Sequence, residues 1–213
     1  MKKIALCATV LAVSALSGCG TVWKNTAPTQ TSLDQIMVST AADRAAASLT
    51  SHYQKQINAD LPRSLGKSFI VAKNFVTSSE LYALQAIRNS FLKEGVILVD
   101  DATKADTIIE VANGALSIDN TSQLVGIPAM ALPIPLAGNV QIPEVSLYKT
   151  VTNRGLSKLS AGFYDAHTGK SKGAPITTIG TATVDNWEAF VFLKFIDNDL
   201  QLPEEYEKSY FLK

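Results

Sequence analysis

The chain has 213 residues, of which 46% are hydrophobic and 18% charged, and its formal net charge is zero. This composition is typical of one globular domain, and it excludes a disordered chain, a collagen and a coiled coil. Without a basic excess the chain lacks the electrostatic attraction on which most nucleic-acid-binding proteins depend, so no nucleic acid is expected as a partner.

The N-terminus has the features of a bacterial lipoprotein signal peptide. Residues 1–3 are a short basic start, and residues 4–16 are uncharged and rich in Ala, Leu and Val, as in the apolar region of a signal peptide. This run is too short to span a bilayer as a stable helix, which needs ~20 apolar residues. It ends in Leu16-Ser17-Gly18-Cys19, which resembles a lipobox. We therefore expect cleavage between Gly18 and Cys19, with an ordinary signal peptide cut near the same place as the alternative.

Cleavage at this position predicts a signal peptide over residues 1–18 and a lipidated Cys19 that anchors the mature chain to membrane lipid. Several acyl chains on one residue hold a protein on a membrane more firmly than one chain does, at ~0.8 kcal/mol per buried CH₂. Gly20 follows Cys19, in place of the Asp that resembles an inner-membrane retention signal. The expected location is therefore the periplasmic face of the outer membrane, with residues 19–31 as a flexible tether.

Cys7 lies inside the signal peptide, so the mature chain keeps a single cysteine and no intramolecular disulfide is expected.

Hydrophobic periodicity predicts two helices in a domain that extends over residues 32–202. The second helix is predicted to begin at the capping box formed by Thr77 and Glu80 and to end at Gly95. The first extends from Ser32 to about Ile57 and has an apolar stripe of Leu33, Met37, Ala41, Ala45, Leu49, Tyr53 and Ile57. The core face of the second helix is predicted to consist of Leu81, Leu84, Ile87, Phe91 and Leu92.

Short apolar and alternating runs predict the strands. Residues 96–99 form a continuous apolar run and are expected to be a buried strand. Residues 145–153 and 156–166 alternate on either side of Arg154-Gly155 and are expected to be a hairpin. Further strands are predicted at residues 68–75, 107–112, 176–184 and 187–196, the last with a helix as the alternative.

Residues 123–142 contain no charged residue, and Pro128, Pro133 and Pro135 interrupt any regular period. Proline fixes φ and removes a hydrogen-bond donor, so we expect an irregular loop. Two interpretations remain open: the segment covers a face of the sheet as ordinary core, or it is an interaction loop. In the second case Met130, Leu132 and Ile134 are expected to contact a second copy, another envelope protein or lipid.

Several short segments spread over residues 33–202 match a family pattern. They are residues 39–45 (Ser-Thr-Ala-Ala-Asp-Arg-Ala), a helix that ends at Gly95 before Val-Ile-Leu-Val-Asp-Asp, Ala105-Asp106, Gly126-Ile127-Pro128, and residues 143–149 (Pro-Glu-Val-Ser-Leu-Tyr-Lys). Together they resemble an uncharacterised family of predicted bacterial outer-membrane lipoproteins, known only as a domain of unknown function. The order helix, Gly, strand, Ala-Asp, strand is also similar to periplasmic α/β domains of the curli-secretion-channel type of lipoprotein. Neither resemblance implies a catalytic residue.

No motif indicates catalysis, a cofactor or a metal, and we expect none of the three. Ser160, Asp165 and His167 could be combined into a Ser–His–Asp set, but no Gly-x-Ser-x-Gly exposes a nucleophile, so His167 is interpreted as a surface-turn residue. Asp197-Asn198-Asp199 lacks the Gly and the distant Glu of a calcium loop and is interpreted as a solvated turn.

The sequence therefore predicts a single α+β domain with a mixed or mostly antiparallel sheet, at least two packing helices, and a C-terminal tail at residues 203–213. The favoured function is a lipid-anchored cell-envelope protein, a non-enzymatic accessory or assembly component that contacts other envelope proteins or itself. The alternatives are a periplasmic hydrolase with an unrecognised site and a module that binds a small apolar ligand or lipid. A cleft of convergent polar groups would favour the enzyme, a closed apolar cavity the ligand module, and an exposed apolar patch the assembly role.

Overall fold

The computed structural model describes residues 31–60, 65–134, 138–203 and 205, although the side chains of residues 56–60 and 134 lie outside the description. The chain divides into two units, Met1–Thr31 and Ser32–Lys213, and the helices and strands below all belong to the second. The expected signal peptide, Cys19, the tether up to residue 30 and most of the tail therefore lie outside the described residues.

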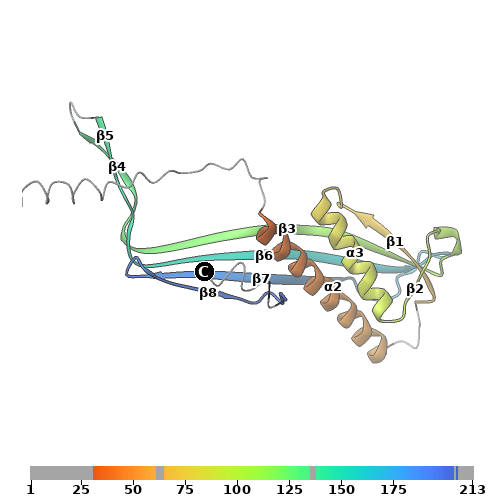
Figure 1. Cartoon of the computed structure of the whole chain (residues 1–213). Helices are drawn as coiled ribbons and strands as arrows, with labels where there is room; N and C mark the ends of the chain where they lie inside the picture. Colours follow the sequence, from red (N-terminus) through yellow and green to blue (C-terminus); the bar gives the residue numbers. More distant parts are fainter. Residues whose placement is uncertain (1–30, 61–64, 135–137, 204, 206–213) are drawn as a thin grey trace, which may run out of the picture. The chain divides into compact units, whose positions relative to one another are not determined.

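The described residues of the second unit form two α-helices and two sheets (Figure 1). The larger sheet has six strands in the order β2-β1-β3-β6-β7-β8, in which β1 pairs in parallel with β2 and β3 and the other pairs are antiparallel. The elements are α2 (Ser32–Asp60), β1 (Lys67–Lys73), α3 (Ser78–Lys93), β2 (Ile97–Leu98), the 3₁₀ turn η1 (Ala102–Lys104), β3 (Thr107–Ile127), β4 (Met130–Ile134), β5 (Gly138–Ile142), β6 (Val145–Asp165), β7 (Ile176–Ala189) and β8 (Leu193–Asn198). This unit is α+β, as predicted, and contains more sheet than helix.

Helix α2 packs on the sheet through the predicted stripe of small and apolar residues. Met37, Ala41, Ala45 and Leu49 are fully buried, which confirms this face of the helix. Gly180 of β7 lies directly against the backbone of Ala41 and Ala45. At Gly155 of β6, a Cβ atom would lie 2.8 Å from the carbonyl oxygen of Met37, so α2 approaches two strands where only glycine leaves room.

Three aromatic rings join the helices to the sheet in the main core. Tyr53 of α2 stacks on Phe163 of β6 with ring centroids 4.6 Å apart. Phe91 of α3 meets both rings edge-on, at 6.2 Å and 6.3 Å. The phenol of Tyr53 is held in this apolar contact, and its burial raises its pKa well above the ordinary value.

Helix α3 begins at the predicted capping box, and Ile87 and Phe91 are fully buried as expected, but the edges of its buried face differ from the prediction. Thr77 caps the helix, and Glu80 accepts hydrogen bonds from the backbone N–H groups of Val76 and Thr77. Leu81 and Leu92 are 53% and 52% exposed, so the prediction that they belong to the core is wrong. The buried side chains are Ala83, Ala86, Ile87 and Phe91.

The reason lies in the contact between α3 and α2. The Ser90 hydroxyl is 2.8 Å from the Thr50 hydroxyl and donates to the carbonyl oxygen of Ala46. Such a close helix pair needs small residues between the backbones, which alanine provides and leucine does not.

Three strand predictions differ from the structure. Residues 145–166 do not form a hairpin, because β6 is one uninterrupted strand of 21 residues. Gly155 does not form a turn in this strand; its missing side chain leaves space for α2. Residues 96–99 contribute only the two-residue edge strand β2, where Ile97 is 60% exposed, so this run is not a buried strand. The aromatic run 187–196 is split between β7 and β8 by a turn at residues 190–192.

The prediction of an irregular loop at residues 123–142 is also wrong. Strand β3 continues to Ile127, and β4 and β5 form a separate two-stranded antiparallel sheet. Pro133 is paired with Asn139 in this ribbon. A two-stranded ribbon leaves one edge of each strand unpaired, and a residue without an N–H group is tolerated on such an edge.

Candidate interaction surface at the end of the sheet

The strands of the large sheet extend beyond the helices at one end (Figure 1). Helix α2 meets β6 at Gly155, and from there β6 continues for ten residues back to its start at Val145. Over this part β6 is paired with β3 on one side and with β7 on the other, and β8 completes the edge. We call this four-stranded part the distal sheet.

The two faces of the distal sheet differ in character. Side chains alternate between the faces along a strand. Ala182 and Val184 of β7 pack with α2 residues in a second, smaller core, so Asn186 and Glu188 share the face on which α2 lies, and Trp187 belongs to the opposite face.

Exposed apolar side chains gather on that opposite face near the end of the strands. Tyr148 and Trp187 meet edge to face with ring centroids 6.0 Å apart. Trp187 pairs across the sheet with Phe195, which is 62% exposed. We define the apolar end as these three residues together with Val125, Leu193 and the turn residues Phe190, Val191 and Phe192, all of which are exposed.

The turn of the apolar end has an unfavourable backbone. Phe190 and Val191 have φ angles of 53° and 71°, a region that L-residues with bulky or β-branched side chains rarely occupy. Backbone conformations of this kind cost of the order of 1–3 kcal/mol each. Phe190, Val191 and Phe192 are nevertheless 61%, 52% and 76% exposed, so the turn presents apolar side chains to solvent at an energetic cost.

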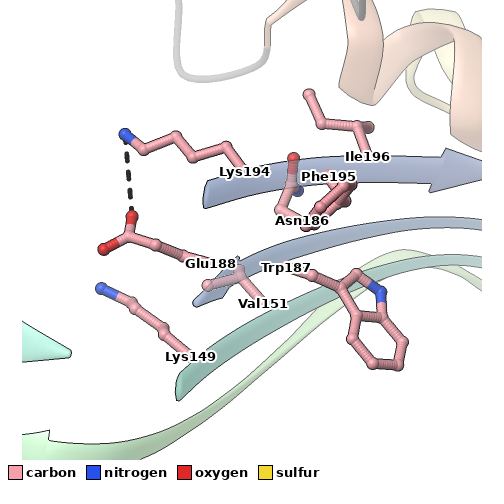
Figure 2. Close-up of a pocket in the computed structure, with 8 residues that line it drawn as sticks. All are labelled: Lys149, Val151, Asn186, Trp187, Glu188, Lys194, Phe195 and Ile196. Atoms are coloured by element: carbon pink, nitrogen blue, oxygen red, sulfur yellow. Dashed lines mark ion pairs between the residues drawn. The ribbon is translucent and has the colours of Figure 1, made fainter. Parts of the chain in front are cut away.

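The face shared with α2 carries ion pairs around an open groove of about 290 Å³ (Figure 2). Lys149, Glu188 and Lys194 are in register on three adjacent strands. The Glu188 carboxylate lies 3.6 Å from the Lys194 ammonium, and Lys149 lies 2.6 Å from Glu144. Figure 2 also shows the Trp187 ring pointing away from the Glu188 carboxylate. The groove is lined on this face by Lys149, Val151, Asn186, Glu188, Lys194 and Ile196, and it is also bordered by Trp187 and Phe195, which alternate toward the other face.

Glu188 is the best-connected charge in this groove. The Ser146 hydroxyl donates a hydrogen bond to it, and this bond, followed by the charge of Lys194, lowers the pKa of Glu188. A carboxylate with a lowered pKa stays ionised at neutral pH and is a poor proton donor. The contacts of Glu188 with Ser146 and Lys194 link β7 to the strands on both sides.

The predicted interaction residues lie in the β4–β5 hairpin. Met130 and Leu132 of β4 are 39% and 43% exposed, and Val140 of β5 is 44% exposed. Ile134 belongs to β4, but its side chain lies outside the described residues. An isolated two-stranded hairpin is only marginally stable in water, so an apolar one benefits from a further contact.

A comparison with known protein families matched residues 12–189 of this chain to DUF6655, a family of unknown function. The chain belongs to the DUF6655 family. This agrees with the expectation of an uncharacterised family, and it supplies no functional residue because the family has no assigned function. A search of curated proteins found no match.

The remaining candidates from the sequence have structural roles in this DUF6655 protein. Asp165 accepts hydrogen bonds from the backbone N–H groups of His167 and Thr168 and from the Thr168 hydroxyl. Its carboxylate therefore organises the turn and does not orient the His167 ring. Ser160 lies within β6, in register with Ala112 of β3.

The solvated turn expected at residues 197–199 is present only in part, because Asp197 and Asn198 end strand β8 whereas Asp199 follows it and is exposed. Asp199 also has specific partners. It lies 2.8 Å from Arg44 of α2 and accepts a hydrogen bond from the backbone N–H of Thr183. These contacts link the segment after β8 to α2 and β7. In the described part of the chain no group of three or more His, Cys, Asp and Glu side chains could hold a metal ion, and no helix there is long and apolar enough to cross a membrane.

The apolar end is not among the sites that the sequence predicts. Residues 187–196 are recognisable as aromatic-rich, but their pattern indicates one strand. The signal that could have identified a turn is the uncharged Ala189–Leu193 stretch between Glu188 and Lys194, since two charges that flank a short apolar run can pair across a hairpin.

Proposed function

We propose that this DUF6655 protein is a lipid-anchored, non-enzymatic component of the cell envelope that presents the β4–β5 hairpin to another envelope protein. The observation that supports this most directly is the hairpin itself, a ribbon with exposed Met130, Leu132 and Val140 in a stretch without charged residues. Apolar ribbons of this kind gain stability when a partner removes their side chains from water.

The anchor is supported by the sequence before the described domain. The Leu16-Ser17-Gly18-Cys19 segment follows an apolar run of signal-peptide length. The bounds of the family match begin at residue 12 and therefore include this segment. An acylated Cys19 that is followed by Gly20 favours a location at the periplasmic face of the outer membrane.

The two alternative functions have less support. The groove on the distal sheet is open, and its charged groups are engaged in ion pairs, whereas a hydrolase needs convergent polar groups that are free to meet a substrate. Its volume of about 290 Å³ is also at the lower limit of ordinary ligand pockets, which are ~300–1,000 Å³ and enclose most of the ligand.

The hairpin proposal is tested by replacing Met130, Leu132 and Ile134 together with Ser and crosslinking the protein in native membranes. We expect the thermal stability of the domain to stay nearly unchanged and the crosslinks to partner proteins to weaken, because the replaced side chains belong to a separate ribbon. A matched control replaces three exposed apolar residues elsewhere, Val76, Leu81 and Leu92, and should keep the crosslinks. If the hairpin variant unfolds while its crosslinks at equal folded concentration are unaltered, the hairpin is ordinary core and the proposal fails.

A further inference from the structure

We propose that the apolar end of the distal sheet inserts into the surface of a lipid bilayer. This gives the protein a membrane contact separate from the acylated cysteine, made by the β7–β8 turn and the side chains beside it. The inference rests on the proposed function only for the nearness of a membrane, because the residues that make the contact all lie in the described domain.

The composition of the apolar end fits the boundary between headgroups and acyl chains. It combines Trp187 and Tyr148 with three phenylalanines, and amphipathic Trp and Tyr rings are enriched at that boundary. Residues 189–193, which form the turn and its first neighbours, contain no charged group. The first charged residues on either side of this stretch are Glu188 and Lys194, and their side chains pair with each other. The uncharged turn can therefore enter an apolar layer without carrying an unpaired ion with it.

The arrangement of the charges sets the orientation and the depth. Glu188 and Lys194 lie on the opposite face from Trp187 and Phe195, so one face of the strand end can meet lipid while the other stays in water. The Phe190 N–H donates to the carbonyl oxygen of Leu147 at 2.9 Å, which satisfies one backbone group of the turn. Because an open sheet edge cannot be accommodated in the hydrocarbon core, insertion is limited to the boundary, within ~5–10 Å.

The strained turn is a second observation that points to an apolar environment. A turn with positive φ angles usually contains Gly, Asn or Asp, and this turn has Phe190 and Val191 instead. These residues make the turn both less stable and less soluble in water than the usual choice. A lipid surface offsets both effects, since it takes up the side chains that the unfavourable backbone displays.

The connection to the anchor allows both contacts to be made with one membrane. Met37 of α2 lies against Gly155 of β6, and Tyr53, later in α2, stacks on Phe163, so the N-terminal end of α2 faces the distal sheet. Tyr148 lies seven residues from Gly155 along β6, or ~23 Å at the rise of a strand. The segment 20–31 that connects Cys19 to α2 can span at most ~40 Å, which covers this distance.

The test uses the mature chain with Cys19→Ser, which removes the anchor, and Trp23→Phe, which leaves Trp187 as the single tryptophan. Binding to vesicles of phosphatidylethanolamine and phosphatidylglycerol is measured by sedimentation, by the blue shift of Trp187 fluorescence and by quenching with bromine-labelled lipid. We expect binding with a blue shift and quenching. A variant with Phe190→Asn, Val191→Gly and Phe192→Ser should lose about tenfold or more in vesicle affinity.

This variant is informative because Asn and Gly accept the positive φ angles of the turn, so it should fold at least as well as the parent protein. The matched control is Ile179→Ser, on the same strand and the same face as Trp187 but outside the apolar end, at 58% exposure. The control should bind vesicles like the parent protein.

Three results would overturn the inference. These are no vesicle binding by the parent protein, equal binding by the turn variant, and a Trp187 blue shift that depends on protein concentration without vesicles, which would assign the apolar end to a second copy. None of them bears on the hairpin crosslinks, so a failure here is distinguishable from a failure of the proposed function.

Discussion

At the scale of single residues, Ile87 and Leu81 of α3 differ in how deeply their side chains are buried. Both are apolar residues that the sequence pattern places on the core face of α3, but Ile87 is fully buried and Leu81 is 53% exposed. Ile87→Ala should therefore lower the free energy of unfolding by ~2–5 kcal/mol, because it removes buried methylene groups and leaves a cavity. Leu81→Ala should change it by no more than ~0.5 kcal/mol. Urea denaturation of both variants measures the difference, and equal losses would show that the face of α3 is wrongly assigned.

Asp165 links stability to pH. Its hydrogen bonds from the backbone N–H and hydroxyl of Thr168 lower its pKa from 3.8 to about 2 in the folded protein. A lowered folded-state pKa gives stability that is present above the unfolded value and is lost as the pH falls through the folded value. Asp165→Asn should therefore be less stable than the wild type above pH ~4, and the difference should shrink as the pH falls toward ~2. Unfolding curves measured over this range test it, and a difference that does not vary with pH would contradict it.

Among the secondary-structure elements, the docking of α2 depends on Gly180 of β7. A side chain at this position would collide with the backbone of α2 at Ala41 and Ala45, so Gly180→Ala should lower the free energy of unfolding by about 1–3 kcal/mol. Gly162 of β6 provides the control, because a Cβ there meets no other atom within 4 Å. Gly162→Ala should be close to neutral in the same thermal or chemical unfolding measurement. If the two variants are equally stable, α2 does not lie as close to β7 as the structure places it.

The sequence predicts the helices better than the strands, and the reason is physical. The stripe of α2 and the capping box of α3 are local patterns set by the 3.6-residue period and by the hydrogen-bond needs of a helix end. A strand boundary depends on the neighbouring strand. Gly155 looks like a turn residue, but in the structure it lies within β6. A glycine is needed there because α2 packs closely against this strand, and not because the local chain turns.

For the whole molecule, the exposed apolar surfaces on which the proposals rest could be predicted only in part. The uncharged stretch 123–142 indicates an apolar surface independently of the backbone conformation that it adopts. In the structure Met130 and Leu132 of this stretch are exposed. The apolar end was not predictable from any one segment. It forms only because β3, β6, β7 and β8 bring Val125, Tyr148, Trp187 and Phe195 to the same end of the sheet.

The proposed function and the further inference both place the protein at a membrane, and Cys19 is the residue on which this depends. The most direct measurement is metabolic labelling with a radioactive or clickable fatty acid, combined with membrane fractionation of the wild type and of Cys19→Ser. We predict that the wild type incorporates label and fractionates with the outer membrane, because in the proposed lipoprotein the thiol of Cys19 would carry a diacylglyceryl group. We predict that Cys19→Ser incorporates none and loses its stable attachment to the membrane. Label on the Cys19→Ser protein, or a wild type found as unlabelled soluble periplasmic protein, would contradict the lipid anchor.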